Sequence, residues 1–247
     1  MKKKLALLAF IALPVFSWAQ PDDDMVYYTD SDVRNSRFGL AANFNPMYTD
    51  LRIINDNIGL GGGGFDLTED EAQGSFQFNY HLDLIYKLNE SFELSIGFGQ
   101  AFGGYTLNDI SYFGAQTGGD TIIADDEVAV SMYTVPIKIN FNSSISDVFD
   151  LEVVPTLELN FINKYEATFM PLDGSTSFTE DFTANAQHLN YSVGLALGGT
   201  YWFADSWGVF VRGGIKYMLN QMMIDQENFG RQTLINYGLN IGVRYNF

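Results

Sequence analysis

The chain has 247 residues, with 30 acidic side chains against 13 basic ones, a formal net charge of -17 and no cysteine. Without cysteine, it has no disulfide framework, no thiolate metal site and no cysteine nucleophile. The negative charge argues against nucleic acid as a partner, and an aromatic content of 15% excludes a chain that is disordered throughout.

Residues 1–19 have the features of a secretory signal peptide. Three lysines follow the first residue, an apolar stretch runs from Leu5 to Phe16, and Ser17 and Ala19 supply the small residues of a cleavage site. The apolar stretch is too short to cross a membrane as a helix. We therefore expect cleavage after Ala19, followed by an acidic periplasmic leader over residues 20–36.

After the leader, apolar residues alternate with polar or small ones at a period of two, which is typical of β-strands. In segment 74–88, aromatic and leucine side chains occupy one face, while Ser75, Asn79 and Asp83 share the other. The pattern predicts eight strands, over residues 37–48, 74–88, 91–105, 127–141, 150–163, 187–203, 206–220 and 232–247. Each is long enough for a tilted transmembrane strand, which needs about 9 to 11 residues.

The connections between these segments alternate between short and long. Residues 89–90 and 204–205 form tight turns, and residues 142–149 form a slightly longer one. The long connections cover residues 49–73, 106–126, 164–186 and 221–231. Short periplasmic turns opposite long outer loops are typical of membrane barrels. The sequence therefore predicts an all-β, eight-stranded antiparallel up-and-down transmembrane β-barrel over residues 37–247, with four long outer loops.

The alternating pattern also fits a soluble lipocalin-like barrel, which would place the apolar face inside around a ligand. The polar face is, however, rich in glycine and charge, which suits the narrow interior of an eight-stranded barrel and would weaken strands on a solvated surface. We therefore expect a charge network in the lumen. Its predicted members are Arg37, His81, Asp83, Lys87, Glu93, Lys138, Glu152, Glu158, Arg212, Lys216 and Arg244.

Aromatic side chains near both ends of the predicted strands resemble the two girdles of a membrane barrel. The turn-side girdle comprises Phe38, Tyr86, Phe92, Phe141, Tyr201, Phe203, Trp207, Tyr245 and Phe247. The loop-side girdle comprises Tyr48, Phe76, Tyr105, Tyr133, Phe161, Tyr191, Tyr217 and Tyr237. Tyr245 and Phe247 end the last strand on one face, like the signal by which outer-membrane barrels are recognised for insertion. Since only helices and closed barrels satisfy the backbone in lipid, we expect an outer-membrane location.

Two stretches resemble the PorT-like family of small outer-membrane β-barrel proteins. Residues Tyr133 to Ile139 are similar to the family strand Tyr-Leu-Glu-Ile-Pro-Leu-Leu-Leu-Lys, with Thr134 in place of the usual Glu. Residues Tyr86 to Leu94 are similar to its second periplasmic-side hairpin. The resemblance covers residues 37–247 and implies the fold and location. Some members are parts of secretion machinery, so it implies no particular activity.

Few residues suggest catalysis. His188, Ser192 and Glu158 are weak candidates, because a similar set occurs near the outer rim of barrel enzymes that edit lipid A. Positions four apart on a strand are separated by about 13 Å, so His188 and Ser192 cannot form a direct hydrogen bond. His81 beside Asp83 is expected in the lumen network. We expect no catalytic site, no cofactor and no metal site.

The long connections contain a glycine run and most of the acidic residues. Gly61 to Gly64 form a flexible loop tip, because the Lys-Ser/Thr and the strand-to-helix context of a phosphate loop are missing. Residues 66–71 and 120–127 lack the spacing of a known calcium loop, so we expect solvated charge runs.

These patterns predict a non-enzymatic integral outer-membrane protein. It is expected to act as a structural or accessory subunit of an envelope or secretion assembly, through its acidic loops. The expected partners are outer-membrane lipid, the barrel insertion machinery through the C-terminal strand, and an envelope protein. A narrow pore and a lipid-modifying barrel enzyme are the alternatives.

Overall fold

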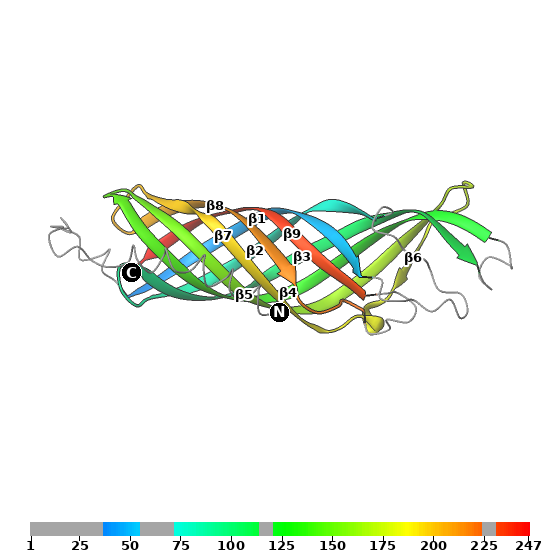
Figure 1. Cartoon of the computed structure of the whole chain (residues 1–247), viewed down its shortest axis with the longest axis horizontal. Coiled ribbons are helices and arrows are strands. Elements are labelled where there is room, and N and C mark those ends of the chain that lie inside the picture. The colour runs from blue at the N-terminus through cyan, green and yellow to red at the C-terminus, as the bar shows by residue number, and fades with distance from the viewer. Residues whose placement is uncertain (1–36, 55–71, 114–120, 224–230) are drawn as a thin grey trace, which may run out of the picture.

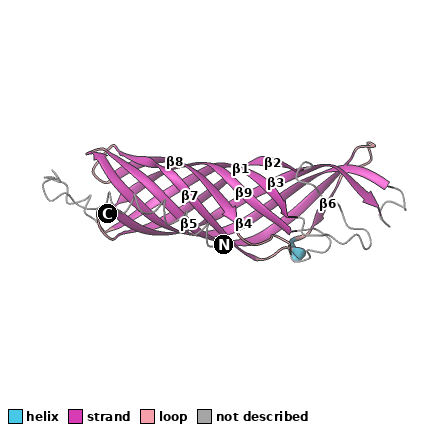
Figure 2. Ribbon diagram, in the orientation of Figure 1, coloured by secondary structure: helices cyan, strands magenta, loops and turns pink. Residues whose placement is uncertain are grey.

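The computed structural model describes residues 37–54, 72–113, 121–223 and 231–247. In these ranges eight strands form a ring: β1 (Phe38–Ile54), β2 (Ala72–Lys87), β3 (Phe92–Phe113), β4 (Thr121–Ser146), β5 (Phe149–Pro171), β7 (Leu189–Trp202), β8 (Trp207–Met218) and β9 (Arg231–Asn246). A short strand, β6 (Phe178–Asp181), pairs with β5 and is followed by the 3-10 helix η3 (Thr183–Asn185) (Figures 1 and 2). The predicted signal peptide, the leader before Arg37, the Gly61 to Gly64 tip and the acidic run 66–71 lie outside the described residues.

The ring closes through its first and last strands. Each strand of the ring pairs antiparallel with its neighbours along the chain, and β1 pairs with β9 from Gly39–Asn246 to Ile54–Arg231. Because the ring closes, the backbone groups of its eight strands find partners within it. The predicted eight-stranded antiparallel up-and-down barrel is confirmed.

Alternation along the strands places apolar residues outside and polar residues inside. On β2, Leu82 is 68% exposed while its neighbour Asp83 is 4% exposed. Large exposed aliphatic and aromatic side chains cover the outside of the other ring strands in the same way. A soluble barrel with its apolar face around an internal ligand is therefore excluded, because the apolar face is the exposed one.

Two of the four predicted outer loops are mostly strand. β3 and β4 continue through residues 106–113 and 121–126, and β5 continues to Pro171 before β6 adds to its edge. Register shifts interrupt the simple alternation, between Leu107 and Ile110 in the β3–β4 pair and between Ser131 and Met132 in the β4–β5 pair. A shift of one residue moves the apolar side chains that follow it to the other face of the strand. A prediction that requires an unbroken period of two therefore ends these strands too early.

The extended strands project beyond the rest of the barrel at the end opposite the C-terminus (Figure 1). The acidic run 120–127, expected to be a solvated loop, falls largely in this part of β4, and Asp126 is buried. The aromatic girdles are largely exposed as expected, but Tyr105 is only 1% exposed. It lies on the inward side of β3, with Ala101 and Gly103, so its assignment to the loop-side girdle is wrong.

Candidate functional site

The described interior of the barrel divides into two layers that differ in chemistry. The ionic layer consists of His81, Asp83, Glu93, Lys138, Glu152, Glu158, Arg212, Lys216 and Arg244, which hydrogen-bond or pair with one another. The apolar layer lies towards the extended strands and is built around Tyr105, Met132, Tyr165, Phe169, Met218, Met222, Met223 and Leu234. The two layers lie one beyond the other along the same lumen.

Arg244 is the most buried cation of the ionic layer. From β9 it donates two hydrogen bonds to Glu93 of β3, Nη2 to Oε1 at 2.8 Å and Nη1 to Oε2 at 3.1 Å. Its guanidinium also lies 4.8 Å from the centre of the Trp202 ring. This bidentate geometry matches the planar fork of arginine to a carboxylate. The contact ties two strands together across the lumen, because β3 and β9 are not neighbours in the ring.

Glu152 of β5 extends this pairing to a second arginine. One of its oxygens accepts from Arg212 Nε at 2.5 Å, and the other accepts from the Thr200 hydroxyl at 2.7 Å. Arg244 Nη1 lies 3.7 Å from the same carboxylate. Two arginines and two glutamates therefore alternate in a continuous chain. Such a chain compensates the cost of burying its charges, whereas any member alone would be an unpaired charge in a poorly solvated space.

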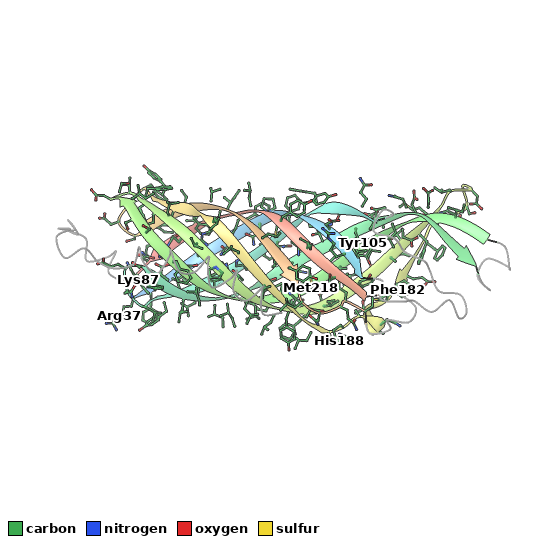
Figure 3. The ribbon with its side chains drawn as sticks, viewed as in Figure 1. Arg37, Lys87, Tyr105, Phe182, His188 and Met218 are labelled. Atoms are coloured by element: carbon green, nitrogen blue, oxygen red, sulfur yellow. The ribbon has the colours of Figure 1, made fainter. Side chains whose placement is uncertain are left out.

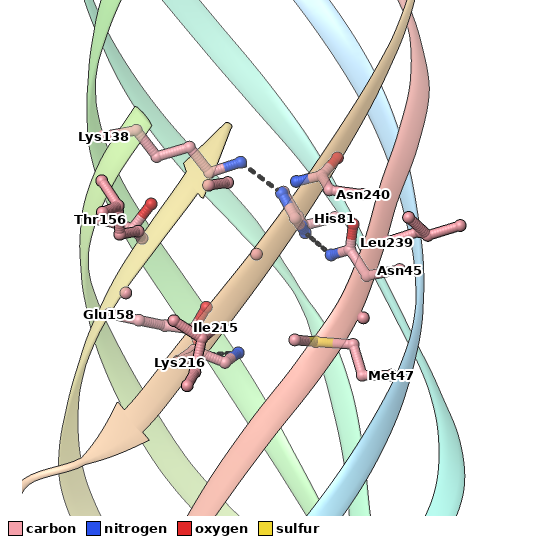
Figure 4. A pocket seen from close by; sticks show the side chains of 15 residues that line it. Asn45, Met47, His81, Lys138, Thr156, Glu158, Ile215, Lys216, Leu239 and Asn240 are labelled. Atoms are coloured by element: carbon pink, nitrogen blue, oxygen red, sulfur yellow. Dashed lines mark hydrogen bonds and ion pairs between the residues drawn. The ribbon is translucent and has the colours of Figure 1, made fainter. Parts of the chain in front are cut away.

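Lys138 forms a second cluster in the ionic layer. Its Nζ donates to Asp83 Oδ2 at 2.7 Å and lies 2.6 Å from His81 Nε2 (Figure 4). Because an ammonium has no acceptor, His81 Nε2 must accept this hydrogen bond, and the remaining proton of a neutral imidazole is on Nδ1. Asn45 Nδ2 is placed 3.2 Å from that Nδ1; because both of these atoms would donate, the amide oxygen of Asn45 is the group that fits there. The arrangement holds His81 in one tautomer between an ammonium and an amide.

Lys216 and Glu158 complete the ionic layer and line a small cavity. Lys216 Nζ lies 2.6 Å from Glu158 Oε1. A cavity of about 70 Å³ is bounded by these two side chains, His81 and Lys138 on one side and by glycine-rich backbone of β7, β8 and β9 on the other (Figure 4). This volume suits a few water molecules, since a water occupies about 30 Å³ in the liquid. Every ammonium that borders the cavity already has a carboxylate partner.

The apolar layer closes the lumen near the end from which the extended strands project, which we call the outer end. Met218, Met222 and Met223 are each no more than 1% exposed, and the hydroxyls of Tyr105 and Tyr165 lie 2.6 Å apart (Figure 3 labels Tyr105 and Met218). The Met222 carbonyl accepts from Gln187 N at 2.6 Å, and Met223 forms an isolated bridge with Ala186. The segment after β8 therefore folds into the mouth rather than away from it.

Two predicted members of the lumen network lie at the rim of the barrel. Arg37 is exposed just before β1, and Lys87 is only half-buried at the end of β2 (Figure 3). The Arg37 carbonyl accepts from Lys87 N at 2.8 Å. The assignment of Arg37 to the lumen is therefore wrong, because at the rim the alternation of faces no longer enforces burial. The other nine predicted members line the interior.

The structure does not bring the three weak catalytic candidates together. Ser192 is buried and accepts a hydrogen bond from Asn160 Nδ2 at 2.7 Å, and Glu158, opposite Ser192 on β5, pairs with Lys216. His188 is exposed before the start of β7 (Figure 3). A serine nucleophile needs a base within hydrogen-bond reach, and the recorded partner of Ser192 is an amide. Among the described residues, no group of three His, Cys, Asp or Glu side chains is placed to hold a metal ion.

The proposed insertion signal lies on the outside of the barrel. The Tyr245 ring lies 4.8 Å from Trp207 and 5.5 Å from Phe247, and Phe247 is exposed. Both side chains lie on the outer face of the folded barrel, and their role as an insertion signal stays a prediction.

The apolar layer was not predicted from the sequence. Its residues alternate inward along stretches that were assigned to loops, as in Tyr165, Ala167 and Phe169. Val128 and Val130 alternate inward with Met132 without interruption, whereas Tyr165 and the residues after it follow a shift of one residue on β5. The alternation of apolar residues beyond the loop-side girdle was therefore the signal from which this layer could have been predicted.

A closed antiparallel ring that is apolar outside and charged inside has the construction of an outer-membrane barrel, because its backbone is satisfied within the ring and its outer face suits lipid. The chain is an integral outer-membrane β-barrel protein. In the part of the chain that the structure describes, no helix is long and apolar enough to cross a membrane.

No family model and no curated protein matches the sequence. Among solved structures, Neisserial surface protein A (NspA) is similar with 12% identity and a TM-score of 0.46, over 86% of this chain and 98% of that one. The outer membrane protease OmpT from Escherichia coli has 11% identity and a TM-score of 0.43, over 89% and 99%. OprG from Pseudomonas aeruginosa has 11% identity and a TM-score of 0.40, over 86% and 96%. The fold assignment rests on this chain's own strand pairing.

Proposed function

We propose that this protein is a non-enzymatic contact subunit of an envelope or secretion assembly, acting through its acidic outer end. The filled lumen is the observation that carries the proposal. Since the ionic layer and the apolar layer both occupy the interior, the surfaces left for function are the two ends and the lipid-facing wall.

The outer end is the more distinctive of the two. Exposed or half-exposed acids on the extended strands include Asp125, Glu127 and Glu166, and β6 adds Glu180 and Asp181. Complementary charge speeds encounter and selects the partner more than it adds affinity. We infer a basic partner surface from this charge. The resemblance to the PorT-like family, some of whose members belong to secretion machinery, agrees with this role.

The two alternative functions have less support. A narrow pore needs an open path, but Arg244, Arg212 and their carboxylates fill the lumen of a barrel that is just wide enough for side chains. A lipid-modifying enzyme needs a base beside Ser192, and exposed His188 does not supply one.

Site-specific photo-cross-linking in intact cells tests the proposal. A photoreactive amino acid replaces Thr179 on β6 in one strain and lipid-facing Leu157 on β5, which is 43% exposed, in the matched control. We expect a discrete protein adduct from Thr179 that is missing from Leu157, because only the outer end is expected to face a partner. Adducts that are the same at both positions, or none at Thr179, would contradict the proposed function.

A further inference from the structure

The outward face of the extended β4–β5–β6 sheet combines exposed apolar and acidic side chains beyond the barrel. We call this face the outer ledge and define it by Ile123, Asp125, Glu127, Met170, Leu172 and Asp181. Ile123 is 46%, Met170 37% and Leu172 55% exposed. Single exposed apolar residues are ordinary on a protein surface, whereas a group of them marks a contact site.

Strand pairing brings the apolar members together. Leu172 is the first residue of the turn after β5, and its N–H donates to the Ile123 carbonyl of β4 at 2.9 Å, so the two residues are neighbours. Met170, two residues before Leu172, lies on β5 and pairs directly with Asp125, which shares its face of β4 with Ile123. The three side chains therefore form one apolar group with a carboxylate at its border.

The remaining acids lie along the same face towards the barrel. Glu127 pairs with Thr168, and the hydroxyls of Thr168 and Thr179 lie 3.0 Å apart, which connects β4 to β6. Asp181 ends β6, and hydrogen bonds from the Thr183 hydroxyl and backbone N–H lower its pKa, so its carboxylate stays charged. Asp125 and Glu127 thus border the apolar group on β4, and Asp181 lies further towards the barrel, opposite Glu166.

The outer ledge lies outside the lipid region. On β4, the outer aromatic girdle is at Tyr133, and Ile123 lies ten residues further along the strand. At about 3.3 Å per residue this is roughly 33 Å of strand. Asp125 and Glu127 lie between the two positions, and charged side chains are not stable in hydrocarbon. Membrane anchoring therefore does not explain the exposed apolar group.

Resting on the function proposed above, we propose that the outer ledge is a docking surface for an extended protein segment in which apolar side chains alternate with lysine or arginine. Ile123, Met170 and Leu172 contact the apolar side chains, while Asp125, Glu127 and Asp181 pair with the basic ones. A second copy of this chain would present the same carboxylates and be repelled, as would an anionic lipid surface.

Binding of a defined peptide to the full barrel tests this surface. The probe is a fluorescent ten-residue peptide that alternates lysine with isoleucine, and the barrel is held in phosphatidylcholine nanodiscs, with empty nanodiscs subtracted. A lysine–serine peptide of equal charge and a glutamate–isoleucine peptide are the matched probes. We expect anisotropy to show binding of the lysine–isoleucine peptide, with at least about tenfold weaker binding of both others.

Variants locate the binding. Met170→Ser with Leu172→Ser is expected to weaken the peptide about tenfold, and Asp125→Asn with Glu127→Gln is expected to weaken it and reduce its salt dependence. The control is Ile145→Ser with Val148→Ser, which removes exposed apolar side chains, 62% and 43% exposed, at the opposite end of β4. Heat-dependent gel mobility checks that each variant folds.

The outcomes separate the two proposals. If the peptide binds wild type and the ledge variants alike, the outer ledge is not the site, while contact through the outer end remains supported. If wild type binds neither basic peptide, both the ledge and the basic partner are contradicted. Self-association through the ledge, measured as a dimer that the Met170→Ser/Leu172→Ser variant abolishes, would contradict the basic segment as the occupant and favour a second copy of this chain.

Discussion

The ionic layer and the apolar layer fill the same lumen by different physics. In the ionic layer, stability depends on the geometry of each ion pair and on every charge having a partner, because an unpaired buried charge is costly. In the apolar layer, stability depends on area removed from water and on close packing, which are less directional. The comparison shows that either chemistry can fill the lumen of an eight-stranded barrel. The two layers are expected to lose stability in different ways when a side chain is replaced.

The largest expected effect is the loss of one partner from the ionic layer. Arg244→Met leaves Glu93 buried without its bidentate partner, which should lower the free energy of unfolding by about 3 to 5 kcal/mol. Urea unfolding in lipid vesicles, followed by tryptophan fluorescence, measures it. The double variant Glu93→Met/Arg244→Met removes both charges and should be more stable than Arg244→Met alone. A double variant that is less stable than the single one would show that pairing is not the cause.

Truncating a side chain in the apolar layer should lower the free energy of unfolding by less than the loss of an ion-pair partner does. The size of this loss should depend little on salt concentration. Leu234 is fully buried, so Leu234→Ala leaves a cavity and should lower the free energy of unfolding by about 2 to 3 kcal/mol. The matched control is Leu219→Ala, at a leucine that is 46% exposed, where less than about 1 kcal/mol is expected. Equal losses at the two leucines would mean that the layer is not packed as described.

A polar contact within the apolar layer is expected to be weaker again. Tyr105→Phe removes one hydroxyl of the Tyr105–Tyr165 pair, which should cost about 1 to 2 kcal/mol because the other hydroxyl stays buried. The same unfolding assay applies. The double variant Tyr105→Phe/Tyr165→Phe should recover part of the loss, and strictly additive losses would argue against a direct hydrogen bond.

The smallest effect is expected for an ion pair outside both layers. Lys164 and Glu166 lie 2.7 Å apart, but the lysine side chain is 56% exposed. Lys164→Met should change the free energy of unfolding by less than about 1 kcal/mol, because water screens the pair. Lys138→Met in the ionic layer is the buried counterpart. If the two lysine variants lose similar stability, burial does not determine how much an ion pair contributes to the free energy of unfolding.

Much of the barrel could be predicted from alternation alone. The contrast between Leu82 and Asp83 on β2 follows directly from a period of two, and so does the inward position of Glu93, Glu152 and Arg244. Ile85 also falls on the inward face by this alternation, and it packs against Ala41 and Phe210 there. Local sequence carries this information because every side chain on a strand has only two directions.

The rest depended on events that a strict period hides. On β4 the inward positions stay in phase from Val128 to Lys138, but the shift beside Met132 adds one residue to β5 between Ile162 and Lys164. Tyr165 and Phe169 could therefore not be assigned by counting on from Phe161. The pairing partners within the ionic layer were also unpredictable, since Glu93 and Arg244 are 151 residues apart and meet only through ring closure. Residues at the rim, such as Arg37, escape the alternation because solvent reaches both sides.

The most direct test of the closed lumen is the conductance of the purified full-length barrel in a planar lipid bilayer. Because the ionic layer and the apolar layer both fill the interior, we predict no stable open level for the wild-type protein under an applied voltage. A large, steady single-channel conductance from folded wild-type barrel would contradict the account, and with it the assignment of function to the outer end.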